Sequence, residues 1–262
     1  MRGVFSVKLF NVLLGMGILF ALWEGLVLSG RYPPALLPPP EKVLRGFQEI
    51  GENGALFRHA IVTLKRFFIG YFASSATAIV LGLFFGWLTK LWDVVEPVVQ
   101  VLRPISPVAW YPFIVLWFGI GDVPATVVIF MAGFFPVLLS TVAAIRLIDP
   151  IYLKVARNFG IKQPFLMIKI VFPAIFPNII TGLHLALGAA WIFMVAGEML
   201  GTQSGLGFLI IDSRNGFRTD LVVCSMITIG LLGLALDKAI VLFERWVNRV
   251  WGLGPSPEIR RS

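Results

Sequence analysis

Long apolar runs dominate this chain, and short polar segments separate them. None of the runs shows the strict apolar–polar alternation of a membrane-barrel strand. Each is longer than the roughly 18 residues that a helix needs to cross a bilayer. The pattern therefore predicts six transmembrane helices, over Leu9–Leu28, Phe67–Leu88, Val94–Ile120, Val123–Ile145, Phe172–Leu200 and Leu221–Val247.

The composition supports an all-α polytopic membrane protein. Of the 262 residues, 58% are hydrophobic and 14% are charged. Soluble domains have about 45–50% apolar and about 25% charged residues, and disordered chains are poorer still in apolar residues. Cys224 is the only cysteine, so a disulfide scaffold is excluded.

The net charge of +8 indicates an orientation rather than a nucleic-acid partner. Basic residues concentrate near both ends of the chain and between the fourth and fifth predicted spans. Because cytoplasmic segments of membrane proteins are enriched in Lys and Arg, we expect both termini to be cytoplasmic.

Four regions follow from this pattern. We expect an N-terminal transmembrane helix (1–30), an external amphipathic segment (31–58), a core with five further spans (59–250) and a cytoplasmic tail (251–262). The external segment opens with several prolines. It then carries Val43, Leu44, Phe47 and Ile50 at helical spacing, which predicts a helix lying on the outer surface.

The core includes a cytoplasmic loop at 146–171 with strong helix signals. Asp149 is a good N-cap, Pro150 a good first helical residue and Gly160 a good C-terminal stop. A second short helix is predicted from near Gln163 toward Val171, and Pro173 would mark the start of the fifth span. This elbow is either a connector on the lipid headgroups or an element that docks on a soluble partner.

Sequence signals for catalysis are missing. No G-x-x-x-x-G-K-[ST] loop, H-E-x-x-H motif or G-x-S-x-G motif occurs, and His59 and His184 fall in different segments. We therefore expect no enzymatic activity, no metal site and no cofactor in this chain.

Small residues recur every four positions in two of the predicted spans. Such stripes allow close helix packing in lipid, and ordinary packing is favoured over a special role around a pathway. The stripes consist of Gly70, Ser74, Ala78, Gly82 and Gly86 in the second span, and Gly182, Ala186 and Ala190 in the fifth.

Ionisable residues inside spans need an explanation, because each costs about 2.5–3.5 kcal/mol at a helix centre. Arg103 could hold the bundle together or face a solute pathway. Glu198, near the outer end of the fifth span, could belong to a gate or to helix packing. His184 could also face the pathway, although a hydrogen-bonded histidine at a helix interface is favoured.

The cytoplasmic loop resembles the "EAA" loop of ABC importer permeases. Ala156, Gly160, Ile170 and Pro173 match that pattern, whereas Lys154 stands at its acidic position. Further stretches resemble the nitrate, sulfonate and taurine branch of these permeases. They are Leu102–Pro107, Leu116–Gly121, Gly182–Leu183, Ala186–Trp191, Ala196–Glu198 and Ser204–Gly207.

The resemblance implies a type I ABC importer permease fold in a prokaryotic cytoplasmic membrane. It implies a homodimer, two ATPase subunits that hold the ATP and Mg²⁺, an external substrate-binding protein, and a small anion as substrate. The loop residues implied to contact the ATPase are Tyr152, Lys154, Val155, Ala156, Arg157, Phe159, Gly160 and Pro173. The alternative is a secondary transporter driven by an ion gradient, although no inverted repeat is visible.

Overall fold

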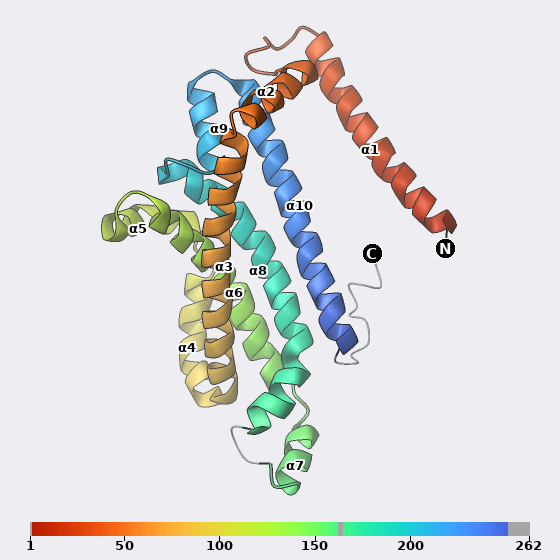
Figure 1. Cartoon of the computed structure of the whole chain (residues 1–262). Helices are drawn as coiled ribbons and strands as arrows, with labels where there is room; N and C mark the ends of the chain where they lie inside the picture. The colour runs from red at the N-terminus through yellow and green to blue at the C-terminus, as the bar shows by residue number, and fades with distance from the viewer. Residues whose placement is uncertain (1, 162–164, 251–262) are drawn as a thin grey trace.

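The computed structural model describes residues 2–161 and 165–250, and this part of the chain is helical throughout, apart from short connections (Figure 1). A 3₁₀ turn (η1, Pro107–Trp110) precedes α5, and a π-helical turn (η2, Met167–Val171) precedes α8. The α-helices are α1 (Arg2–Leu28), α2 (Pro40–Glu52), α3 (Ala55–Trp87), α4 (Thr89–Leu102), α5 (Tyr111–Phe118), α6 (Asp122–Arg146), α7 (Pro150–Asn158), α8 (Phe172–Gly201), α9 (Leu206–Asn215) and α10 (Thr219–Val250).

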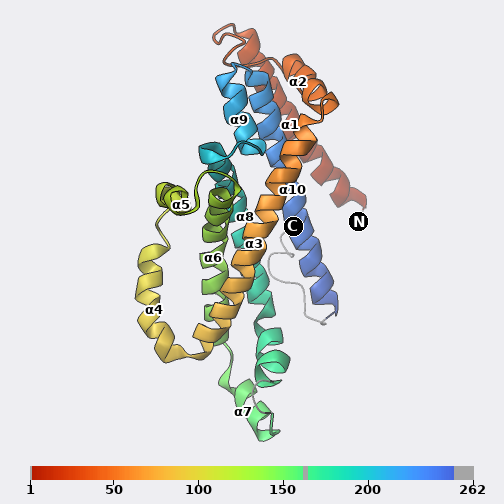
Figure 2. The ribbon, with the colours of Figure 1, turned by 60° about the vertical axis from the view of Figure 1, so that its left-hand side comes forward.

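Helix α6 lies at the centre of the bundle, in contact with α3 and α8 (Figures 1 and 2). The main buried cluster joins Phe67 of α3, Leu138 of α6 and both Trp191 and Met194 of α8. Phe67 and Trp191 meet edge to face, with ring centroids 5.0 Å apart. Large aromatic side chains therefore fill the space between α3 and α8, beside α6.

The predicted small-residue stripe of α3 faces α6. A Cβ built on Gly70 would lie 2.8 Å from Ile129 Cβ, and one on Gly82 would lie 2.7 Å from Thr141 Cβ. On α8, a Cβ at Gly182 would overlap the Ser140 side chain of α6. The stripes therefore let α3 and α8 approach α6 closely, as the helix-packing interpretation predicted.

Gly70 offers a direct test of this close approach. Replacing it with alanine should destabilise the bundle by about 1–3 kcal/mol, because the new methyl group would lie 2.9 Å from the Thr126 carbonyl oxygen, which the backbone holds in place. Thermal unfolding followed by tryptophan fluorescence in detergent would measure the loss. Gly188→Ala is the control, since a Cβ there has nothing within 4 Å. An equal effect of both substitutions would contradict the packing argument.

Within the described residues, four helices are long and apolar enough to cross a membrane: α3, α6, α8 together with η2, and α10. A fifth span results if α4 and the segment Pro107–Phe118 are counted together. These two pieces are bent by 85° relative to each other, so the prediction of one continuous helix over Val94–Ile120 was wrong. Pro104 and Pro107 explain the break, since proline lacks the N–H that continues a helix.

Helix α3 begins at Ala55, well before the predicted start at Phe67. The polar residues that ended the apolar run on that side include Arg66, which is buried in the structure. At about 1.5 Å per residue, the 33 residues of α3 span roughly 50 Å, more than the roughly 30 Å of a hydrocarbon core. The helix is therefore long enough to extend beyond the membrane.

Helix α2 is the amphipathic helix predicted between the first two spans. Its residues Val43 and Ile50 are buried against Leu221 and Cys224 of α10. Leu44, predicted on the same face, is 65% exposed, because it lies about 100° around the helix from Val43. The amphipathic prediction thus holds for Val43 and Ile50 and was wrong for Leu44.

An ion pair fastens α2 to the turn before α10. Arg218 donates to both carboxylate oxygens of Glu49, at 3.1 and 2.6 Å, and also to Asp220. Its hydrogen bonds hold the pKa of Glu49 below the ordinary value for a glutamate. Helix α1 is attached through Trp23, whose Nε1 donates to the Pro38 carbonyl at 3.1 Å. Much of the apolar surface of α1 is exposed, so this helix packs more loosely than α2.

Candidate functional site

Helix α7 projects from the end of the bundle opposite α2 and α9 (Figure 1). It starts at Pro150, and the Asp149 carboxylate accepts the Ile151 N–H at 2.8 Å, as an N-cap does. Past its end, Gly160 has φ +72°, and the Ile161 N–H donates to the Ala156 carbonyl at 3.1 Å. This is the 6→1 bond of a Schellman motif, so the structure has the predicted start and stop.

One side of α7 is anchored and another is free. Ala156 is 3% exposed and belongs to a cluster with Leu166 and Val171. Three apolar residues at four-residue spacing, two on α7 and one in the turn that follows it, are instead exposed. We call them the exposed stripe of α7: Ile151 (62%), Val155 (47%) and Phe159 (81%). A short helix whose described side chains include a buried alanine on one side and an apolar stripe on another has the form of a docking element.

The structure describes only some of the other side chains that were predicted to contact the ATPase. Lys154 is exposed. Tyr152 and Arg157 fall within α7, but their side chains lie outside the described part of the structure. The start of the second predicted helix, near Gln163, also falls outside the described residues.

The helix that follows the elbow is continuous with α8. The Phe172 N–H donates to the Met167 carbonyl, which is the i→i−5 bond of a π turn. The described residues 165–171 are helical, as predicted, but they continue into α8 without a break, so Pro173 lies within an uninterrupted helical segment, Met167–Gly201. The wider π turn leaves room for the proline ring, which would clash with the preceding turn of a regular α-helix.

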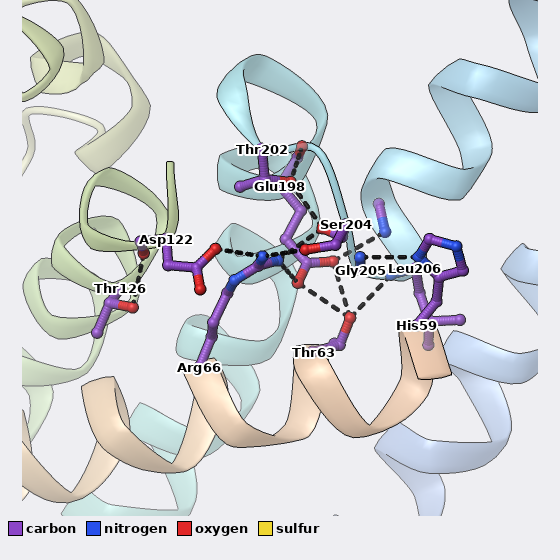
Figure 3. Close-up of polar contacts among 11 residues, drawn as sticks. His59, Thr63, Arg66, Asp122, Thr126, Glu198, Thr202, Ser204, Gly205 and Leu206 are labelled. Carbon is purple, nitrogen blue, oxygen red and sulfur yellow. Dashed lines mark hydrogen bonds and ion pairs between the residues drawn. The ribbon is translucent and has the colours of Figure 1, made fainter. Parts of the chain in front are cut away.

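A buried polar network, drawn in Figure 3, lies where α3 begins and α8 ends, toward the end of the bundle that carries α2 and α9 (Figure 1). Its centre is Arg66 of α3, whose side chain is 2% exposed. One guanidinium nitrogen donates to Glu198 Oε1 at 2.8 Å, and the other donates to Asp122 Oδ1 at 2.5 Å. Both nitrogens also donate to Ser204, to its carbonyl and its hydroxyl oxygen. Arg66 thus joins α3 to α6, α8 and the loop between α8 and α9 through one planar group.

Glu198 is fully buried on α8 and is surrounded by donors. The Thr63 hydroxyl lies 2.9 Å from both carboxylate oxygens, and the Gly207 N–H donates to Oε2 at 2.9 Å. Thr63 in turn accepts the Leu206 N–H at 2.8 Å. A buried carboxylate is tolerated only when it is paired and hydrogen-bonded in this way.

Two glycines let the α8–α9 loop fold onto Glu198. Gly205 has φ +106°, and a Cβ there would overlap the Glu198 carboxylate. A Cβ on Gly207 would lie 2.7 Å from the Val195 carbonyl oxygen. The Gly205 N–H donates to His59 Nδ1 at 3.0 Å, so that ring nitrogen acts as an acceptor.

The three predicted pathway residues lie in separate surroundings and form no hydrogen bond or ion pair with one another in the described part of the chain. Glu198 lies in the buried network, bonded to α3 and to α9. His184 Nε2 lies 2.8 Å from Asp237 Oδ1 of α10, which is the helix-interface arrangement favoured for it. Arg103 lies at the break between α4 and η1 and lines a cavity of about 300 Å³.

Sequence reasoning missed most of the buried network. Arg66 and Glu198 are 132 positions apart, and no local pattern links them. Thr63 and Asp122 carry no motif either. A usable signal was present at Ser204–Gly207, where two closely spaced glycines follow an in-span glutamate. No group of three or more His, Cys, Asp or Glu residues able to hold a metal ion occurs within the described ranges.

Comparison with known proteins identifies the family. The sequence profile of "Binding-protein-dependent transport system inner membrane component" matches residues 78–250. A putative ABC transporter permease protein of Methanocaldococcus jannaschii is 36% identical over 85% of each chain. The putative aliphatic sulfonates transport permease protein SsuC of Bacillus subtilis is 30% identical, covering 90% of this chain and 87% of its own.

Two further similarities extend this result. The taurine transport system permease protein TauC of Escherichia coli is 27% identical over 88% of this chain and 86% of its own. The inward-facing MetNI methionine ABC transporter contains a chain with the same fold, with a TM-score of 0.53 and 19% identity over 72% of this chain and 98% of that one. The chain thus belongs to the family of inner-membrane permease components of binding-protein-dependent ABC transport systems.

Proposed function

We propose that this permease subunit imports a small anion of the sulfonate, taurine or nitrate kind. The observation that carries the coupling part of this proposal is the exposed apolar stripe of α7, on a helix whose two ends are fixed by Asp149 and Gly160. Such a stripe suits a groove on a soluble ATPase. Permeases of this family have no catalytic function or cofactor of their own, so ATP and Mg²⁺ would bind to that partner.

The assembly would contain two copies of this chain, two ATPase subunits and one external binding protein. Each α7 would insert into one ATPase, which places α7 and both termini on the cytoplasmic side. The end that carries α2 and α9 would then face the binding protein. The basic residues near α7 support this orientation, and α1 would add a sixth span, since Leu13–Leu28 is an apolar helix.

Two of the reported relatives support the choice of substrate. One is named for aliphatic sulfonates and the other for taurine, and both align with most of the chain. The similarity to ABC transporter permeases, which work with a separate ATPase, weighs against the alternative of an ion-gradient-driven carrier.

Reconstituted uptake would test the proposal. The permease is assembled in liposomes with its ATPase and its binding protein, and entry of radiolabelled taurine, ethanesulfonate and nitrate is measured. We expect saturable uptake of at least one of these solutes. This uptake should require ATP on the side of the membrane where the ATPase lies. Ethyl methyl sulfone, an uncharged analogue similar in size to ethanesulfonate, should not compete. Uptake without ATP, or of uncharged solutes alone, would overturn the proposal.

A further inference from the structure

Arg103 lies at the break in the bent span, where it is exposed in the described chain, and its surroundings differ from those of Arg66 and Arg146. Arg66 contacts Glu198 and Asp122, and Arg146 contacts Asp93 at 2.8 Å. For Arg103, the described part of the chain offers no carboxylate within ion-pair distance. An arginine in a predicted span without a counter-charge either reaches polar surroundings or awaits an anion that the protein chain does not supply.

The surroundings of Arg103 form a pocket. The cavity of about 300 Å³ is lined by the break in the bent span, including Arg103 and Ser106, and by Met131 and Phe135 of α6 and Phe193 of α8. This volume lies at the lower end of the range for small-molecule sites, and one charged group among apolar walls is their usual composition.

A second, apolar cavity adjoins the first. It has a volume of about 260 Å³ and shares Met131 and Phe135 as walls. Its other walls include Trp110, Trp117 and Phe118 from the segment that follows the break. One continuous surface therefore offers a positive charge and a hydroxyl group at one end and aromatic side chains at the other.

We propose that these two cavities form a binding site for an organic anion with an apolar tail, such as an alkane- or arenesulfonate. The anionic head lies at Arg103 and Ser106, and the tail lies against Phe135 and Trp117. A guanidinium can donate two parallel N–H bonds to two oxygens of a sulfonate, and the aromatic side chains offer apolar contact to the tail. This inference rests on the proposed anion import and narrows it, because an inorganic anion would leave the aromatic cavity without a ligand.

Thiol labelling tests the site without a transport assay. Cys224, the only cysteine, is buried and is replaced by alanine, and Ser106→Cys then provides a reporter in the cavity. The permease–ATPase complex in phosphatidylcholine nanodiscs, which leave both faces accessible, is treated with the methanethiosulfonate reagents that carry a sulfonatoethyl or a trimethylammonioethyl group. Ile105→Cys is a second reporter in the same cavity, in case the first variant fails to assemble.

We expect Arg103→Gln to lower the ratio of anionic to cationic labelling rates by on the order of tenfold, as one unit charge a few ångströms away would. Arg103→Lys should keep most of the ratio. Butanesulfonate should protect the thiol better than ethanesulfonate, and Trp117→Ala should remove that difference. At an exposed control position, Asn53→Cys, none of these changes should appear.

Three results would overturn the site: a ratio that Arg103→Gln leaves unchanged, equal protection by both sulfonates, or protection by added phosphatidylglycerol but not by butanesulfonate. The last result would assign Arg103 to a lipid headgroup. The labelling does not depend on uptake. A positive labelling result together with failed anion uptake would therefore count against the proposed function alone.

Discussion

Replacing Arg66 with glutamine should lower the stability of this permease by about 3–5 kcal/mol. The substitution leaves the fully buried Glu198 carboxylate without a cation, and breaking a buried ion pair from one side has a cost of that size. Thr63 and the Gly207 N–H would remain as donors, but neither carries a charge. Thermal unfolding in detergent, followed by tryptophan fluorescence, would show the loss.

Arg146 provides a matched control for this substitution. It also contacts two carboxylates on another helix, Asp93 at 2.8 Å and Glu96 at 3.8 Å, but its side chain is 37% exposed. Exposed ion pairs contribute about 0–1 kcal/mol, so Arg146→Gln should have a small effect. Similar losses from both variants would mean that the burial of Arg66 has no energetic importance.

The double variant Arg66→Gln/Glu198→Gln separates a charge effect from a general packing effect. Once Arg66 is gone, removing the Glu198 charge should restore part of the stability, with a coupling of roughly 0.5–3 kcal/mol between the two sites. Additive losses would show that the two side chains act independently. A coupling energy in that range would show that the ion pair between the two side chains helps to hold the α8–α9 loop against α3.

Local features of the fold could be predicted from the sequence. The apolar runs of α6, α8 and α10 locate these helices to within a few residues, since length and hydropathy alone decide whether a segment can span a bilayer. The ends of α7 were also predictable, because Asp149 and Gly160 act on the backbone within a few positions of themselves.

Features that depend on contacts between distant segments could not be predicted in this way. The charge on Arg66 ended the apolar run, so the sequence placed it outside the second span, whereas its partners on α6 and α8 bury it. Likewise, the 85° bend after α4 follows from Pro104 and Pro107, but hydropathy counts the residues on both sides as one run. Hydropathy records composition and takes no account of hydrogen-bonding geometry.

Placing two carboxylates on the exposed stripe of α7 should abolish ATPase association and ATP-driven uptake. In the variant Val155→Asp/Phe159→Asp, both new side chains would lie where the structure exposes apolar surface, so α7 itself should remain folded. Central apolar anchors of an interface contribute about 2 kcal/mol or more each, which predicts a roughly thousandfold weaker association. Co-purification of the ATPase and its binding to nanodisc-embedded permease would measure it.

Two controls make this result specific. Val155→Leu/Phe159→Leu keeps the stripe apolar and should retain most of the association. Leu44→Asp/Phe217→Asp adds the same charge at two exposed apolar residues, 65% and 82% exposed, at the opposite end of the bundle, and should leave ATPase binding unchanged. If the α7 variant still binds the ATPase at full strength, the stripe is not the docking surface. The interpretation of the elbow as a connector lying on the lipid headgroups would then be preferred.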